Sequence, residues 1–315
     1  IDMIASASYL PLVLCLFYRA MDAPSPKKIV FAGIVLAFQL LAGYHTMAFF
    51  TMEAVGVMTL FFCLKQRSAV PAIRAILAAL LGLGLTAFSI LPIQEFVSLS
   101  IRTFPRPYEW SSYGAISWRE ILQLFNPFMF GDQLTYWASP PNYWEHALFV
   151  GRMGILLAFV GFIAIMRNRS RQVLGLLAIT LIIFGIWMSV GSHAFVDLQK
   201  VLWQLVPMYK YLRIPSRHLF LVTFGLSVLV GVGLSHIRNS ILRHFIIFVL
   251  AVEMIVYARH FVSVAGVPES RHDRALVAAV TNTTGLGRLL PNFGVWVPPR
   301  DSLDFDSVME YKIFS

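Results

Sequence analysis

Apolar residues along the chain fall into eight runs that are separated by polar segments. These runs cover residues 3–18, 29–42, 46–64, 75–97, 148–166, 173–190, 217–237 and 245–260. A helix needs about 20 apolar residues to cross the hydrocarbon core of a bilayer upright, and several of the runs are shorter than that. The pattern predicts an all-α polytopic membrane protein with about eight transmembrane helices.

The apolar stretch from 29 to 64 is too long for one membrane span. The sequence GYHT, from Gly43 to Thr46, places turn residues near its middle. We interpret the stretch as two short helices joined at the membrane surface, with one tilted helix as the alternative.

Composition agrees with this pattern and excludes a soluble domain. Of the 315 residues, 58% are hydrophobic and 13% are charged, and the mean hydropathy is +0.71. Such values are far too apolar for a water-soluble fold. Cys15 and Cys63 lie in apolar runs without an evident partner. The sequence therefore suggests neither a disulfide nor a metal site, and it indicates no cofactor.

Basic residues concentrate in four short loops, where eleven of them accompany a single acid, Asp22. They are Arg19, Lys27, Lys28, Lys65, Arg67, Arg74, Arg167, Arg169, Arg171, Arg238 and Arg243. Cytoplasmic loops collect such residues, so the loops 98–147 and 191–216 and the tail from 261 are predicted to lie outside the cytoplasm. The net charge of +9 is largely a topology signal, and no basic, aromatic-interleaved patch indicates nucleic-acid binding.

The two large outer loops each contain a pattern typical of a short interfacial helix. Residues Ser117 to Asp132 begin with a candidate capping box, because Glu120 follows Ser117 by three positions. Residues Phe195 to Pro207 alternate apolar and polar positions at helical spacing. These loops also hold Trp110, Trp118, Tyr136, Trp137, Tyr143, Trp144 and Trp203. Such aromatics form interfacial belts, and the alternative is stacking on sugar rings or on a prenyl chain.

Composition changes near residue 260, which predicts two domains. Residues 1–260 form the transmembrane helical domain, and residues 261–315 mix charged, turn and strand-like segments without a further apolar run. We expect the start of an extracytoplasmic α/β domain there, cut off at Ser315. The chain opens on Ile1 without a leader pattern, so we interpret it as an internal fragment.

Several segments follow one another along the chain in a distinctive order. They are QLLAGYHTMAFFT, LPIQEFVSLSIR, LFNPFMFGD, YWEHALFVGRMGILLAFVGF, WQLVPMYKYLRIPSRHLFLVTFGLSVLVGVGL and, in the tail, GVWVPPRDSLDFDSVMEY. Their order resembles the YfhO-type bacterial membrane proteins of the GT-C glycosyltransferase superfamily. The resemblance implies an enzyme of the bacterial cell (inner) membrane. It would move a sugar from a polyprenyl-phosphate donor to a cell-envelope glycan or polymer at the outer face. The catalytic carboxylate of that superfamily lies in the first outer loop, so here it is expected upstream of Ile1.

Arg213 and Arg217 are the candidate ligands of the donor phosphate. Their spacing places both on one helical face if a helix extends through Pro215. If Pro215 instead starts the helix, Arg217 lies in its first turn. Two guanidinium groups at the outer surface suit a phosphate. The alternative is that both arginines reach up to lipid head groups.

Other polar residues near the outer surface are weaker candidates for donor or acceptor binding. Glu95 with Arg102, and Glu145 with Arg152, have the spacing of structural ion pairs, and substrate binding is the alternative. Glu53 and Glu253 lie deeper, so they are expected to be protonated or paired within the bundle. His45, His193 and His218 match no metal motif, and His45 is the one most expected to face a cavity.

Two other functions remain open at this point. A lipid or glycolipid transporter or flippase would use intramembrane charges, although no internal repeat supports it. A non-catalytic envelope-assembly protein with the same helices would also place arginines at the outer face.

Overall fold

The computed structural model describes residues 2–22, 25–99, 106–132, 135–138, 143–167 and 172–260. All regular secondary structure in these ranges is helical, without a strand, which confirms the all-α prediction for this part of the chain. The expected α/β tail, residues 261–315, lies outside the described residues.

The helices follow one another along the chain with short connections, apart from the two outer loops. In order they are α1 (Asp2–Ser8), α2 (Leu10–Asp22), α3 (Pro26–Leu41), α4 (His45–Gln66), α5 (Val70–Leu85), α6 (Ala87–Ser98), α7 (Tyr108–Ser112), η2 (Trp118–Leu124), α8 (Tyr143–His146), α9 (Arg152–Arg167), α10 (Gln172–Val190), η4 (Gly191–His193), α11 (Leu198–Leu205), η5 (Pro207–Tyr211), η6 (Pro215–His218), α12 (Leu219–Ser235) and α13 (Ser240–Ala258).

All eight apolar runs form helices, but fewer than eight are long enough to span a membrane. Five qualify by length and composition among the described residues, or six if the bent pair of α5 and α6 is one span. The five are Asp2–Asp22, His45–Gln66, Gln172–His193, Pro215–Ser235 and Ser240–Ala258. Since α3 and α9 have 16 residues each, they fall short of an upright span. The structure supports a multi-pass membrane protein without confirming eight spans.

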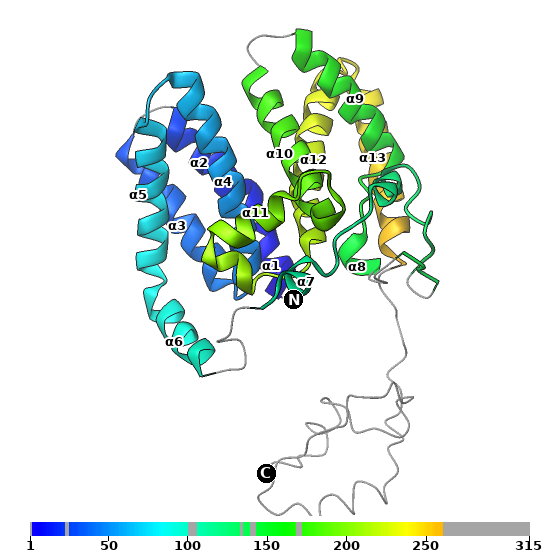
Figure 1. The fold of residues 1–315 in the computed structure, drawn as a ribbon. Coiled ribbons are helices and arrows are strands. Elements are labelled where there is room, and N and C mark those ends of the chain that lie inside the picture. Colours follow the sequence, from blue (N-terminus) through cyan, green and yellow to red (C-terminus); the bar gives the residue numbers. More distant parts are fainter. Residues whose placement is uncertain are drawn as a thin grey trace, which may run out of the picture. The chain divides into compact units, whose positions relative to one another are not determined.

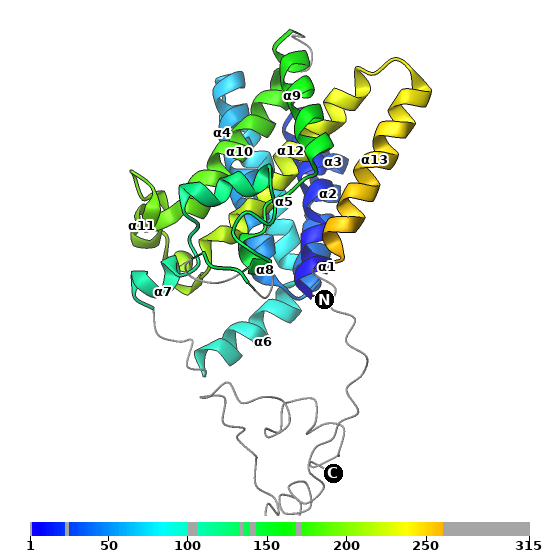
Figure 2. The same cartoon turned by 90° about the vertical axis from the view of Figure 1, so that its right-hand side faces the viewer.

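The run 75–97, predicted as one segment, is broken between α5 and α6, whose axes differ by 75°. Thr86 lies at the break, and its hydroxyl donates to the carbonyls of Gly82 at 3.0 Å and Leu83 at 3.2 Å. These bonds satisfy carbonyl groups at the end of α5, and Pro92 lies inside α6, where it removes a backbone donor. No residue of α6 is buried, and Figure 2 shows α6 turned away from α5.

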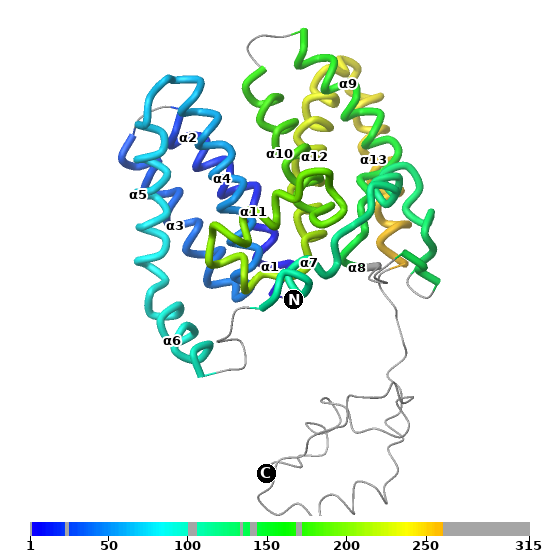
Figure 3. Tube along the Cα trace, in the orientation of Figure 1, coloured from blue at the N-terminus to red at the C-terminus, as the bar shows by residue number. Residues whose placement is uncertain are grey.

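The GYHT sequence separates α3 from α4, which confirms two helices and excludes one tilted helix. Gly43 has φ +94°, a left-handed conformation that glycine adopts without a steric penalty. The α3–α4 turn lies at the opposite end of the bundle from the ends of α2, α4, α9 and α12, as Figures 1 and 3 show. The basic loops therefore share one end, as the topology prediction requires, and the side of the membrane remains a prediction.

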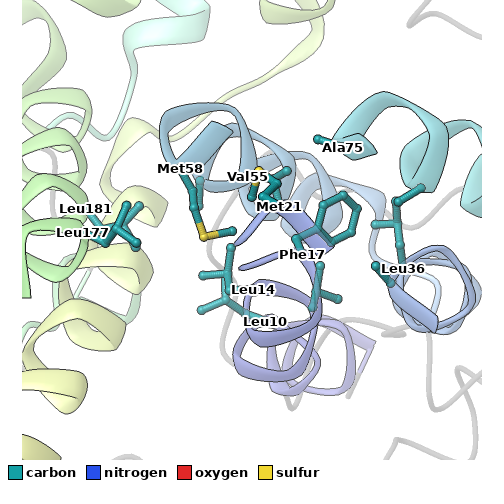
Figure 4. Packing of buried hydrophobic residues seen from close by; sticks show 14 of the residues in the cluster. Leu10, Leu14, Phe17, Met21, Leu36, Val55, Met58, Ala75, Leu177 and Leu181 are labelled. Carbon is teal, nitrogen blue, oxygen red and sulfur yellow. The ribbon is translucent and has the colours of Figure 1, made fainter. Parts of the chain in front are cut away.

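The helices form two groups that contact one another (Figure 1). The first group packs α2, α3, α4 and α5 around Leu14, Phe17 and Leu36, and it meets Leu177 and Leu181 of α10 (Figure 4). In the second group, α9 and α12 approach closely at Gly161 and Gly233. A Cβ atom added to Gly161 would lie 2.0 Å from the carbonyl oxygen of Leu229, so only glycine fits there.

Both short helices predicted in the outer loops are present. The first, η2, is a 3₁₀ helix with the predicted capping box of Ser117 and Glu120. The second, α11, begins after Asp197, whose Oδ1 accepts a hydrogen bond from the backbone N–H of Lys200 at 2.9 Å. These caps hold the loops that carry the polar side chains described next.

Candidate functional site

A half-buried ion pair joins α8 to η6 at the end of the bundle predicted to face outward. Arg217 Nη2 lies 2.5 Å from Glu145 Oε1, and Arg217 Nε lies 3.0 Å from Glu145 Oε2. Arg217 Nη1 also donates to the hydroxyl of Tyr44 at 2.5 Å. The two charged side chains are 15% and 17% exposed. The bidentate contact is the strong form of an arginine–carboxylate pair. The hydrogen bond to Tyr44 links the α3–α4 turn to η6.

The next residue of η6, His218, makes a buried pair with Glu53 of α4. His218 Nε2 lies 2.7 Å from Glu53 Oε2, and His218 Nδ1 lies 2.8 Å from the carbonyl oxygen of Pro215. Because a carbonyl only accepts, Nδ1 carries a proton. Nε2 then either donates to a carboxylate or accepts from a carboxylic acid. In both states the pair is neutral overall, which suits its burial.

Tyr209 of η5 completes this second cluster, because its hydroxyl hydrogen-bonds Glu53. Burial raises the pKa of the Tyr209 phenol, and the charge and the hydrogen bond of Glu53 raise it further. The phenol therefore stays a donor at neutral pH, and Glu53 is held from two sides.

A third cluster lies in the outer loops and is the most deeply buried of the three. Glu120 Oε1 is 2.7 Å from His146 Nδ1 and accepts from the Tyr136 hydroxyl at 2.7 Å. Glu120 Oε2 accepts from the backbone N–H of Ser117 at 2.7 Å. His146 and Glu120 are 0% and 2% exposed. Burial would raise the pKa of the Glu120 carboxyl, but these hydrogen bonds outweigh it, so the pKa is lowered.

The chain links the three clusters directly. Glu145 and His146 are neighbours on α8, and Arg217 and His218 are neighbours on η6. We call the combined set of Tyr44, Glu53, Glu120, Tyr136, Glu145, His146, Tyr209, Arg217 and His218 the polar network. It runs from η2 through α8 and η6 to α4.

Arg213 stands apart from the polar network. Its guanidinium lies over the ring of Tyr113 at 4.4 Å and near that of Trp110 at 5.8 Å, and the residue is exposed. Ile214 has φ +66°, so no helix extends through Pro215, and η6 starts at Pro215. The prediction that both arginines share one helical face is therefore wrong. The alternative, in which Pro215 starts a helix and Arg217 lies in its first turn, is confirmed.

The predicted Glu145–Arg152 ion pair is wrong, because Glu145 pairs with Arg217 instead. Arg152 is exposed at the start of α9, where its backbone N–H donates to Glu253 Oε1 at 2.8 Å. The N–H of Met153 donates to Glu253 Oε2 at 3.3 Å. Glu253 is thus paired within the bundle as expected, and its partners are the free N–H groups of a helix start.

The other candidates lie outside the polar network. Glu95 is exposed on α6, and its proposed partner Arg102 lies outside the described residues. His45 is the first residue of α4 and is half-buried, whereas its neighbour Tyr44 reaches Arg217. His218 lies in η6, at the end of the bundle predicted to face outward, and only 2% of it is exposed.

Sequence reasoning missed the roles of Tyr44, Tyr136, His146 and Tyr209. The capping-box position of Glu120 and the adjacency of His146 to Glu145 were the available signals. Among the described residues, no group of three or more histidine, cysteine or acidic side chains has a metal-binding arrangement.

Comparison with known proteins gives this chain no relative: no family model matches it, and no curated protein or solved structure is significantly similar to it. The resemblance to YfhO-type proteins stays a prediction.

Proposed function

We propose that this chain is part of a membrane glycosyltransferase that moves a sugar from a polyprenyl-phosphate donor to a cell-envelope glycan or polymer. The observation that carries the proposal is the exposed guanidinium of Arg213, which lies over the rings of Tyr113 and Trp110 at the predicted outer end of an apolar bundle. An arginine without a carboxylate partner among the described residues suits a lipid-linked phosphate.

Glycosyl transfer needs a cation that stabilises the departing phosphate. Arg217 is already neutralised by Glu145, whereas Arg213 is exposed and no carboxylate lies within ion-pair distance of it among the described residues. We therefore assign phosphate binding first to Arg213. The guanidinium lies over the rings of Tyr113 and Trp110, which contain no acceptor for its N–H groups there, so these groups remain for an anion.

The prenyl chain of the donor also needs an apolar surface. α6 exposes one, because Phe88 and Phe96 are 72% and 73% exposed on a helix without buried residues. Such side chains suit a lipid bilayer and a prenyl chain equally well.

The test is sugar transfer by the full-length protein in lipid vesicles, with a polyprenyl-phosphate sugar as donor. Lysine at position 213 keeps the charge and loses the two-pronged geometry. Arg213→Lys is expected to lower the transfer rate about tenfold to a hundredfold, the equivalent of one charge-assisted hydrogen bond. Arg238→Lys, at the opposite end, is the matched control. Normal transfer by Arg213→Lys would remove Arg213 from the site.

A non-catalytic envelope-assembly protein is the second candidate. The mutual pairing of Arg217 with Glu145 and of His218 with Glu53 favours it, because satisfied pairs also serve to lock helices together. Full-length protein that binds the donor without transferring sugar would favour this second candidate.

A further inference from the structure

A hollow of about 550 Å³ opens beside the third cluster of the polar network. Its wall includes Ser117, Trp118, Arg119, Glu120, Trp137 and His193. This volume is within the range of small-molecule sites, roughly 300–1,000 Å³. The hollow is separate from Arg213 and Arg217, which do not line it.

Two tryptophans of this hollow are exposed although each is held in place. Trp118 is 53% exposed, and its indole N–H donates to the carbonyl oxygen of His193 at 3.2 Å. Trp137 is 68% exposed, and its ring packs against Phe130 with 5.0 Å between centroids. A tryptophan that only anchors the protein in a membrane does not need to be held in place beside a hollow. An indole ring that is held in place offers a fixed face on which the apolar face of a ligand can stack.

Polar groups surround these rings. Glu120 forms a buried part of the wall, and its oxygens already accept three hydrogen bonds. Arg119 is exposed and has no carboxylate within ion-pair distance among the residues that the structure describes. Arg119 offers five N–H donors, and the exposed His193 ring adds a further polar edge. Apolar faces flanked by donors match a pyranose ring, which has an apolar C–H face and a hydroxyl edge.

We propose that this hollow is a saccharide-binding subsite. A pyranose ring stacks on Trp118 and Trp137, and Arg119 and His193 hydrogen-bond its hydroxyl groups. The choice of a saccharide rests on the proposed function, and the subsite would hold the glycan acceptor.

The experiment is a titration of the full-length protein in nanodiscs with two soluble probes, a trisaccharide of glucose and a trisaccharide of N-acetylglucosamine. Tryptophan fluorescence and calorimetry report binding. We expect saturable binding of at least one probe at millimolar concentration or below. Trp137→Ala and Trp118→Ala should each weaken it about tenfold or more. Trp118→Phe keeps a ring and should restore part of the affinity.

Trp144→Ala is the matched control, because Trp144 is 57% exposed in the same loop and does not line the hollow. Its affinity should equal that of the unaltered protein. The thermal unfolding temperature of each variant separates lost binding from lost folding. The subsite would be overturned by absence of saturable binding for both probes, or by equal losses in Trp144→Ala and in folded Trp137→Ala.

This outcome is distinguishable from that of the transfer assay. Saccharide binding that depends on Trp137, in a protein that transfers no sugar, would retain the subsite and reject the transferase. Sugar transfer that depends on Arg213, in a protein that does not bind either saccharide, would retain the transferase and reject the subsite.

Discussion

The described part of the molecule contains two buried histidine–glutamate pairs, and they differ in what the second ring nitrogen contacts. His218 is satisfied on both sides, by Glu53 and by the carbonyl oxygen of Pro215. His146 contacts Glu120 and Tyr136 through Nδ1, and its buried Nε2 has no hydrogen-bond partner among the described residues. The first pair joins two helices of the bundle, whereas the second lies in the outer loops.

This difference separates a locking contact from an adaptable one. The Glu53–His218 pair has a fixed proton at Nδ1 and closes α4 against η6 and η5. The Glu120–His146 pair lies beside the hollow and retains an unused ring nitrogen. We infer that the first pair contributes mainly to stability and that the second combines local order with a place next to the proposed saccharide subsite.

The largest expected effect comes from breaking the locking pair. His218→Leu removes the histidine partner of the buried Glu53 carboxyl and leaves it only the Tyr209 hydroxyl, and breaking such a buried pair typically costs about 3–5 kcal/mol of unfolding free energy. The double variant Glu53→Leu/His218→Leu should recover part of this loss, because no buried charge then remains. Unfolding in detergent micelles measures both.

Glu95→Gln is the control for this pair, because Glu95 is an exposed glutamate and should change stability by about 0.5 kcal/mol or less. A cost for His218→Leu no larger than that of Glu95→Gln would mean that the pair locks nothing.

A smaller effect is expected in the outer loops. Glu120→Ala removes the acceptor of three hydrogen bonds and leaves buried donors unpaired, at a cost of about 1–3 kcal/mol. Because the loss is local, hydrogen exchange should increase in η2 and α8 before it increases in α4 or α12. Glu109→Gln, exposed in the same loop, is the control. Increased exchange across all helices alike would show that the two pairs are not separable.

The smallest effect is a pH dependence that belongs to Glu120 alone. Its pKa is lowered in the folded state from the ordinary value of 4.5. Its contribution to stability is therefore complete above that value and is lost as pH falls through the folded pKa. The stability difference between the unaltered protein and Glu120→Gln should be constant near neutral pH and shrink below about pH 4.5. If this stability difference instead grew as the pH fell, the pKa of Glu120 would be raised in the folded state, which would contradict the prediction.

Local features of this fold were readable from the sequence because their causes are local. Apolar runs of sufficient length became helices, Gly43 marked the α3–α4 turn, and the Ser117–Glu120 capping box was predicted from spacing alone. The break at Thr86 was missed, because a threonine within an apolar run usually bonds its own turn without a sharp bend.

Partner choice at the site was not readable, because it depends on tertiary contacts. Glu145 is separated from Arg217 by 72 residues, whereas the predicted partner Arg152 is close in sequence. The positive φ of Ile214, which separates the directions of Arg213 and Arg217, is unusual for a β-branched residue and carries no sequence signal.

The measurement that tests the central claim most directly is equilibrium binding of a polyprenyl-phosphate sugar to the full-length protein, compared with the same prenyl alcohol without phosphate. We predict that the unaltered protein and Arg238→Lys prefer the phosphate-bearing lipid. Arg213→Lys should fold normally because Arg213 is exposed. It should bind the phosphate-bearing lipid at least about tenfold more weakly than the unaltered protein does. Equal affinity of Arg213→Lys and the unaltered protein for the phosphate-bearing lipid would contradict the account.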